Sequence, residues 1–286
     1  MTSAPTCAPA PWSGCWDLPI EPRCGTLNKK EDHGGAMKTV NIKSPGGWDI
    51  PADYTIEGHE AMVCIIAHGF GSSRKSSTAQ MMLEHCKALG MGAVAFDWPC
   101  HGGSEAPYTA LTIDNCQRDL QAVEQWAVQR APGAEIVYFG SSFGGYNTLL
   151  HLCSGVSLGR RAVLRSCAVD MDTLFTIDTP GVREQIAEKG YYHYDPGFGP
   201  GLDLCETFFE TLAGNSPFKL TLPDGVKVHL IHGMDDDVVD PAEAYRYAAE
   251  KRVPITLIPA TGHGIDSELG ISTLLRLTAS FYTQAK

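Results

Sequence analysis

Gly140-Ser141-Ser142-Phe143-Gly144 is the stretch that decides the fold, because of what stands on either side of it. The preceding run, Glu135-Ile136-Val137-Tyr138-Phe139, is short, apolar and rich in β-branched and aromatic residues, which predicts a buried strand. The following residues, 146–153, predict a helix. A G-x-S-x-G between a strand and a helix is typical of a nucleophile elbow, a strained turn that holds a serine hydroxyl above a sheet.

The spacing of the glycines selects one of the two serines. Glycine is needed two residues before and two residues after the nucleophile, because the strand and the helix approach each other closely there. Ser142 has Gly140 and Gly144 at these positions, whereas Ser141 would have Phe139 and Phe143. We therefore expect Ser142 to be the nucleophile.

The chain contains a second copy of the pattern, Gly155-Val156-Ser157-Leu158-Gly159. It follows the predicted helix and precedes the apolar run 162–164, which is the reverse of the order that an elbow requires. We interpret this copy as a surface loop that closes the helix. The surrounding elements, and not the five-residue pattern, make Ser142 the candidate.

Composition excludes several classes of function. The chain has 286 residues, 43% of them hydrophobic and 19% charged, which suits one soluble α/β domain. A net charge of −11 disfavours nucleic acid as a partner. No apolar run approaches the roughly 20 residues of a membrane span, and no ordinary secretory signal is visible. We expect a cytoplasmic protein, with monomer and dimer equally open.

The ten cysteines indicate reduced thiols rather than disulfides. Most of those after residue 40 fall in predicted strands and helices, where cysteine behaves as a small buried hydrophobe. No C-x-x-C pair is present, so we expect no metal site. Cys7, Cys15 and Cys24 lie in a proline-rich leader, and their redox state stays open.

The chain divides into an irregular N-terminal extension, residues 1–36, and an α/β domain, residues 37–286. Strands are expected near 38–43, 51–57, 62–67, 93–96, 135–139, 161–165, 226–231 and 254–258. Helices are expected over 77–89, 112–130, 146–153, 241–251 and 266–284. This alternation predicts a mostly parallel sheet with helices on both faces. Residues 168–223 are rich in proline and aromatics and too long for a plain loop, so we interpret them as a partly helical cap.

Two strand-end loops carry the residues that could activate a serine. A serine nucleophile needs a base, and the base needs an orienting acid. Three consecutive aspartates, Asp235 to Asp237, follow the strand at 226–231, and His263 follows the strand at 254–258. In an open parallel sheet these loops meet at one edge.

The chain here resembles the α/β-hydrolase superfamily, over nearly everything after residue 40. The order Ser142, Asp236, His263 is that of the family's nucleophile, acid and base. The segment His68-Gly69-Phe70-Gly71 is similar to its oxyanion loop. The segment 97–104 is similar to its D-x-x-G-H-G-x-S turn, with Cys100 in place of the usual glycine. The branch that looks most similar is that of cinnamoyl/feruloyl esterases and monoacylglycerol lipases.

The resemblance implies the roles of the remaining site residues. The backbone N–H groups of Phe70 and Phe143 should hold the oxyanion, and no metal or organic cofactor is needed. The family commonly places its acid three residues after the strand-end glycine, which selects Asp236. Asp170 or Asp172, after the strand at 161–165, is the alternative acid, because some members use that strand.

Other polar residues of these loops have simpler interpretations. Asp235 and Asp237 are expected to be solvated turn residues, and Asp240 to cap the helix that starts at Pro241. His68, His101 and His232 each precede a glycine, and we expect them to brace the backbone rather than transfer protons.

The predicted function is hydrolysis of a small-molecule carboxylic ester through an acyl-enzyme. A serine peptidase or acyl-peptide hydrolase could use the same residues, and a ligand sensor could use the same fold without turnover. A dehalogenase is disfavoured because its nucleophile would be an aspartate. The aromatic residues of the cap, including the run 191–194, favour small aryl or short-to-medium acyl groups, with hydroxycinnamates as the specific hypothesis.

Overall fold

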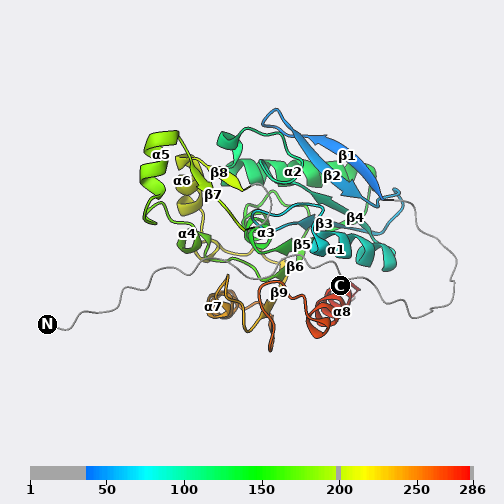
Figure 1. Ribbon diagram of the computed structural model, residues 1–286. Coiled ribbons are helices and arrows are strands. Elements are labelled where there is room, and N and C mark those ends of the chain that lie inside the picture. The colour runs from blue at the N-terminus through cyan, green and yellow to red at the C-terminus, as the bar shows by residue number, and fades with distance from the viewer. Residues whose placement is uncertain (1–36, 198–200, 284–286) are drawn as a thin grey trace.

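The computed structural model describes residues 37–197 and 201–283. Within them one sheet has the strand order β1-β2-β4-β3-β5-β6-β9-β10 (Figure 1). Its strands are β1 (Lys38–Lys43), β2 (Asp49–Tyr54), β3 (Met62–Ala67), β4 (Gly92–Phe96), β5 (Glu135–Ser141), β6 (Arg161–Arg165), β9 (Lys227–Gly233) and β10 (Ile255–Ile258). β2 is antiparallel to both β1 and β4, and the other neighbouring pairs are parallel.

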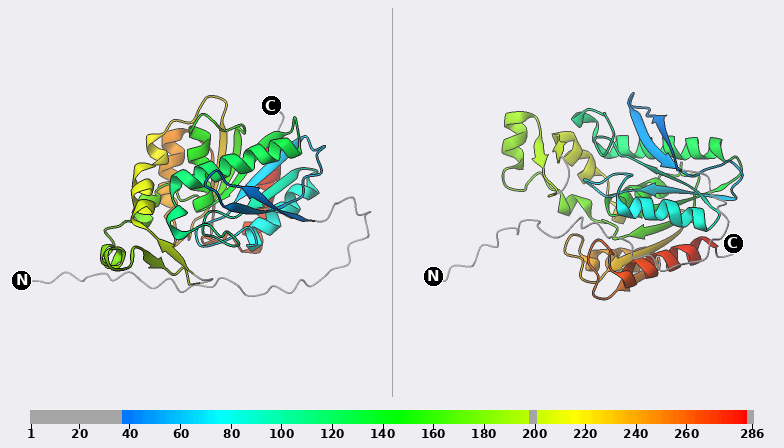
Figure 2. Two further views of the ribbon diagram at one scale, coloured as in Figure 1. Left: turned by 90° about the horizontal axis from the view of Figure 1, so that it is seen from above. Right: turned by 45° about the vertical axis from the view of Figure 1, so that its right-hand side comes forward.

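Helices cover both faces of this sheet (Figures 1 and 2). They are α1 (Ser77–Ala88), α2 (Ile113–Arg130), α3 (Phe143–Cys153), α7 (Pro241–Lys251) and α8 (Glu268–Thr283). α1 and α8 pack on one face, where His85 Nε2 lies 3.0 Å from the Leu275 carbonyl oxygen. α2, α3 and α7 contribute to the core on the other face.

Local sequence explains why these elements form. β3 and β4 are apolar throughout, as strands covered on both faces must be. α2 begins after Thr112, whose hydroxyl accepts a hydrogen bond from the N–H of Asn115. α7 begins after Asp240, whose carboxylate accepts from the N–H of Ala242, with Pro241 in the first turn. The cap predicted at Asp240 is confirmed.

The stretch 168–223 lies between β6 and β9 and extends beyond one end of the sheet (Figures 1 and 2). It contains α4 (Met171–Leu174), α5 (Val182–Lys189), β7 (Tyr192–Tyr194), β8 (Leu202–Leu204), α6 (Glu206–Gly214) and the 3-10 turn η2 (Pro217–Lys219). β7 and β8 form an antiparallel pair. The Tyr146 hydroxyl of α3 donates to the carbonyl of Asn215, 2.8 Å away, and so joins this segment to the sheet.

The predicted elements match the observed ones closely, with an informative difference at the elbow. The strands at 62–67 and 161–165 and the helix at 241–251 have their predicted bounds. β5 runs on to Ser141 and α3 starts at Phe143, so the turn is one residue long, shorter than the pattern predicted. The extension 1–36, with Cys7, Cys15 and Cys24, lies outside the described residues. No helix in the described ranges is long and apolar enough to cross a bilayer.

Candidate active site

Ser142 alone forms the turn between β5 and α3, in a strained conformation. Its φ of 52° and ψ of −114° lie in a region that residues with a side chain rarely adopt. The backbone around it holds this geometry, since the Ser142 N–H donates to the Arg165 carbonyl at 2.9 Å. The Ser142 carbonyl accepts from the N–H of Tyr146 at 3.0 Å. A strained turn of this kind, fixed on both sides, is the geometry expected of an elbow.

Both flanking glycines stand where backbones meet. A Cβ on Gly140 would lie 2.7 Å from the carbonyl oxygen of Gly144. A Cβ on Gly144 would clash with the carbonyl of Ala67 at the end of β3. The close approach of strand and helix that selected Ser142 over Ser141 is therefore present.

Asp236 and His263, from two strand-end loops, form a hydrogen-bonded pair. His263 Nδ1 lies 2.8 Å from Asp236 Oδ2, so Nδ1–H donates to the carboxylate and Nε2 keeps its lone pair. Asp236 Oδ1 accepts from the N–H groups of Val238 and Val239 at 2.9 and 2.8 Å. His263 thus meets Asp236, whereas the alternative acid Asp170 faces Asp172.

The environment sets the charge of each partner. Burial works to raise the pKa of the Asp236 carboxyl, but hydrogen bonds from His232 and His263 outweigh it and hold that pKa well below its usual range. Burial lowers the pKa of His263, and the nearby Arg165 and His232 act in the same direction, while Asp236 opposes them. At neutral pH the pair is therefore a carboxylate and a neutral imidazole, the state that a general base needs.

Ser142 and His263 line one cavity of about 1020 Å³. One part of its wall is polar and comes from the loop before α1, the end of β6 and the loop after β10. Another part comes from the segment between β6 and β9 and is largely apolar: Met171, Leu174, Phe175, Tyr194, Pro196 and Leu202. The proposed nucleophile and base thus share a pocket that is lined in part by the segment predicted to be a cap.

The two predicted oxyanion residues lie beside Ser142. A Cβ on Gly69 would be 3.4 Å from the Ser142 Cβ, which places the loop of Phe70 against the elbow. Phe143 is the first residue of α3, so its N–H has no acceptor within the helix. The rings of Phe70 and Phe143 are 5.2 Å apart. Both residues therefore lie close to Ser142, and their role in holding an oxyanion stays a prediction.

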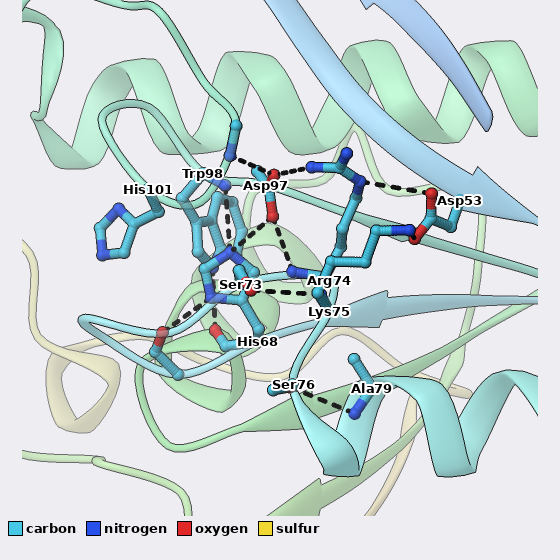
Figure 3. Close-up of polar contacts among 12 residues, drawn as sticks. Asp53, His68, Ser73, Arg74, Lys75, Ser76, Ala79, Asp97, Trp98 and His101 are labelled. Carbon is cyan, nitrogen blue, oxygen red and sulfur yellow. Dashed lines mark hydrogen bonds and ion pairs between the residues drawn. The ribbon is translucent and has the colours of Figure 1, made fainter. Parts of the chain in front are cut away.

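Buried charges hold the loop that carries Phe70 (Figure 3). The Arg74 N–H donates to Asp97 Oδ1 at 2.6 Å, and the Arg74 guanidinium pairs with Asp97 and, at 3.4 Å, with Asp53. Both carboxylates are fully buried, and Lys75 adds an ion pair of 2.6 Å to Asp53. Asp97 Oδ2 also accepts from the Gly103 N–H at 2.8 Å. The loop before α1 is thereby fastened to β2 and to the turn after β4.

His68 and His101 brace backbone, as predicted. His68 Nδ1–H donates to the Gly69 carbonyl at 2.7 Å, and its Nε2 accepts from the Trp98 N–H at 3.3 Å. His101 Nδ1–H donates to the carbonyl of Pro99 at 2.9 Å, and its ring points away from Asp97 in Figure 3. Burial lowers the pKa of His68 to about 4 and that of His101 to about 3, so both are neutral.

Arg165 connects the end of β5, next to Ser142, with the loop that carries His263. The sequence reasoning did not identify this residue. Its guanidinium donates to the Ser141 hydroxyl at 2.5 Å and also to the Gly264 carbonyl. The next residue, Ser166, donates from its hydroxyl to the His263 carbonyl at 2.9 Å. Burial lowers the Arg165 pKa to about 10, which still leaves a cation at neutral pH. No sequence signal marks this arginine, because its partners lie far away in the sequence, in β5 and in the loop after β10.

His232 also contacts Asp236, which the sequence reasoning did not anticipate. Its Nε2 lies 3.1 Å from the Val239 carbonyl, as a bracing histidine would, but also 2.9 Å from Asp236 Oδ2. The only signal in the sequence was its place four residues before Asp236, where the strand ends. His232 therefore contacts the predicted acid directly.

The second G-x-S-x-G occupies a loop after α3, which confirms the interpretation made from the sequence. Ser157 lies outside the residues that line the cavity. Its hydroxyl is 2.8 Å from that of Tyr138 and donates to the Gly159 carbonyl at 2.9 Å. The loop wraps the buried carboxylate of Glu124, which accepts from the Leu158 N–H at 2.9 Å. The hydrogen bonds of Ser157 thus stabilise the loop.

Of the aromatic run 191–194, Tyr194 lines the cavity. Tyr191 instead packs edge-on against Tyr108, with ring centroids 5.4 Å apart. His193 pairs with Asp203 at 2.7 Å. Burial raises the pKa of Tyr194 to about 12, so its hydroxyl stays protonated and can donate a hydrogen bond. Across the described ranges no cluster of three or more His, Cys, Asp or Glu could hold a metal ion.

Residues 64–268 match the model of the alpha/beta hydrolase family. The chain belongs to that family. The match contains the elbow, the loop of Phe70, Asp236 and His263. The mostly parallel sheet with helices on both faces is accordingly an α/β-hydrolase fold.

The individual relatives found share low sequence identity with this chain. The palmitoyl-protein thioesterases ABHD10, mitochondrial, of Pongo abelii and Homo sapiens are each 26% identical over 229 residues, or 74% of this chain. The match spans only 64% of the length of these curated relatives.

Solved structures share the fold at low identity. A putative hydrolase from Agrobacterium vitis S4 superposes with a TM-score of 0.73 at 20% identity, over 86% of this chain and 98% of that chain. Est1E from Butyrivibrio proteoclasticus, also solved with ferulic acid bound, superposes with a TM-score of 0.66 at 17% identity, over 86% of this chain and 99% of that chain.

Proposed function

We propose that this chain hydrolyses carboxylic esters through an acyl-enzyme, with Ser142 as nucleophile, His263 as base and Asp236 as orienting acid. The observation that carries the proposal is the arrangement of the three groups. Asp236 and His263 are hydrogen-bonded at 2.8 Å, and His263 shares a cavity with a serine held at a strained elbow. Neutral His263, with its proton on Nδ1 toward Asp236, has an unprotonated Nε2 that can accept a proton.

The reaction then takes two steps. The Ser142 Oγ attacks the ester carbonyl while its proton passes to His263 Nε2, and the imidazolium delivers that proton to the departing alcohol. Water, activated by His263 in the same way, then releases the acid and restores Ser142. The backbone N–H groups of Phe70 and Phe143 stabilise the oxyanion in both steps, where loss of one such donor typically costs about 3–4 kcal/mol. Asp236 holds the imidazole tautomer and stabilises the imidazolium.

The cap supports a preference for small aryl or short-to-medium acyl groups, with hydroxycinnamates as the specific proposal. Phe175 and Tyr194 line the cavity with their rings 5.1 Å apart, in an edge-to-face arrangement that suits a flat acyl group. The protonated hydroxyl of Tyr194 could donate to an oxygen at the far end of such a substrate.

A thioester is the second candidate substrate. It is supported by the name of the curated relatives at 26% identity, palmitoyl-protein thioesterase. The cavity of about 1020 Å³ also stands at the upper end of the roughly 300–1,000 Å³ that is common for small-molecule sites, so a longer acyl chain has room. Thioester cleavage would use the same three residues, with a thiol as leaving group.

A substrate panel tests these proposals. It comprises acetyl, octanoyl and cinnamoyl p-nitrophenyl esters, methyl ferulate, a palmitoyl thioester and aminoacyl amides. Turnover of the esters, fastest for cinnamoyl or feruloyl, supports the first proposal, and selective turnover of the palmitoyl thioester supports the second. Preferential amide cleavage would favour a peptidase, and saturable binding without turnover would favour a ligand sensor. Labelling by a fluorophosphonate, mapped by peptide mass to Ser142, identifies the nucleophile independently of the substrate.

A further inference from the structure

The carboxylate of Asp236 has four close polar partners, two at each oxygen. Oδ1 accepts from the backbone N–H groups of Val238 and Val239 at 2.9 and 2.8 Å. Oδ2 lies 2.8 Å from His263 Nδ1 and 2.9 Å from His232 Nε2. A carboxylate has about four lone-pair sites, so this one is fully occupied. Among the four partners of Asp236, the side chain of His232 is the one that the proposed reaction of Ser142, His263 and Asp236 does not use.

The contacts of His232 determine where its proton lies. Its Nε2 faces two acceptors, Asp236 Oδ2 at 2.9 Å and the Val239 carbonyl at 3.1 Å, so Nε2 must carry a hydrogen. Its Nδ1 is buried and has no hydrogen-bond partner among residues 37–197 and 201–283. A proton on Nδ1 would therefore be buried without an acceptor, which is costly. Nε2 of His232 therefore carries the hydrogen that lies toward Asp236 Oδ2 and the Val239 carbonyl.

We propose that His232 is a positioning residue of the reaction, the fourth member of a Ser142–His263–Asp236–His232 chain. Its side chain is 1% exposed and comes from β9, so the sheet fixes its position more firmly than a loop could. Because His232 and His263 donate to the same oxygen, His232 fixes that oxygen where His263 Nδ1–H needs it. The inference rests on the proposed function, since it assigns a role within that site.

The shared oxygen also limits how strongly Asp236 attracts His263. Each hydrogen bond to a carboxylate lowers its basicity. Loss of the His232 N–H would leave a more basic Oδ2, which stabilises the imidazolium form of His263 and raises the His263 pKa. Arg165 at the end of β6 acts electrostatically on His263, and Asp266 after β10 acts on Arg165, and a substitution at His232 leaves both residues in place. A shift in the pKa of His263 would thus be caused by the loss of the His232 N–H beside Asp236.

The test compares His232→Leu, which removes the donor, with His232→Gln, whose side-chain amide N–H can reach the position of Nε2. In the full chain, H232L should lower kcat about tenfold, as expected for a misplaced catalytic group. It should also move the acidic limb of the kcat/KM profile upward by about half a unit to one pH unit. H232Q should keep the wild-type limb and most of kcat. His229→Leu is the matched control, since His229 is on the same strand and contacts Thr256 at 2.9 Å instead.

A second measurement separates this inference from the proposed function. The pKa of His263, followed by ¹⁵N NMR in wild type, H232L and H232Q, needs no substrate, so it remains decisive if no ester is turned over. Equal His263 pKa values in wild type and H232L would overturn the inference, as would a shift in H232Q equal to that in H232L. If H232L does not fold, His232→Asn replaces it, because its amide is too short to reach Asp236 and should behave as the lost donor.

Discussion

The two G-x-S-x-G segments stand at opposite ends of one helix, α3, and differ in almost everything except their pattern. Ser142 precedes the helix, has a φ of 52° and lines the cavity. Ser157 follows the helix, bonds Tyr138 and Gly159, and lies outside the residues that line the cavity. The order of strand, turn and helix therefore carries the chemistry. The pattern only permits it.

The glycines of the two segments also serve different purposes. Gly144 is required for space, because a Cβ there would clash with the carbonyl of Ala67. Gly155 has a φ of +79° and open space around a hypothetical Cβ, so it is required for its backbone conformation. The first segment is thus built into the packing of the sheet, while the second ends a helix.

The largest expected effect comes from the serines. Ser142→Ala should lower kcat/KM for the best ester by at least about 10³-fold, since the nucleophile is lost and only binding and oxyanion stabilisation remain. Ser157→Ala should stay within about twofold of wild type, as surface-loop changes usually do. Steady-state kinetics with the p-nitrophenyl esters measures both. A dead Ser157→Ala beside an active Ser142→Ala would reverse the roles of the two segments.

The next largest effect is expected at Asp236, the proposed acid that orients His263, the base for Ser142. Asp236→Asn should lower kcat by about 10³- to 10⁴-fold, because an amide can hold His263 in the wrong tautomer. Asp170→Asn is the control, and it should change kcat little, since Asp170 faces Asp172 rather than His263. Both are measured as kcat with saturating ester. A collapse in Asp170→Asn with Asp236→Asn near normal would move the acid to the end of β6.

The glycines give a third test, of stability rather than turnover. Gly144→Ala should destabilise the fold by about 3 kcal/mol, the upper part of the range for overpacking, because its neighbour is rigid backbone. Gly155→Ala should cost about 1 kcal/mol, the strain of a side chain at positive φ. Urea unfolding followed by circular dichroism gives both free energies of unfolding. Equal losses at the two glycines would show that packing does not distinguish the two segments.

The sequence predicts features that depend on neighbouring residues better than contacts between residues far apart along the chain. The elbow, the strand-end loops and most elements are local patterns, so Ser142, Asp236 and His263 could be selected before the structure was known. The two hydrogen-bond partners of the Arg165 side chain come from β5 and from the loop after β10, and no local pattern encodes them. The same holds for the pairing of Arg74 with Asp97, which joins the loop before α1 to the turn after β4.

The cap marks another limit of local reasoning. Proline and aromatic content predicted an irregular, partly helical segment, and α4, α5 and α6 lie there. Composition could not say which aromatic rings face the cavity, because that depends on how the segment folds back. Tyr194 lines the cavity, while Tyr191, three residues earlier, packs on Tyr108.

The smallest effect should appear in the pH profile. Burial, with Arg165 and His232, lowers the pKa of His263, while Asp236 opposes them. The base must be neutral to accept the Ser142 proton, so kcat/KM should fall as the pH drops through that pKa. The acidic limb should therefore lie below pH 6.5, the usual value for histidine. Ser157→Ala should trace the wild-type profile, because its hydroxyl contacts Tyr138 and Gly159 instead. A limb above pH 7 in wild type, or a displaced limb in Ser157→Ala, would contradict this account of the base and of its independence from the second segment.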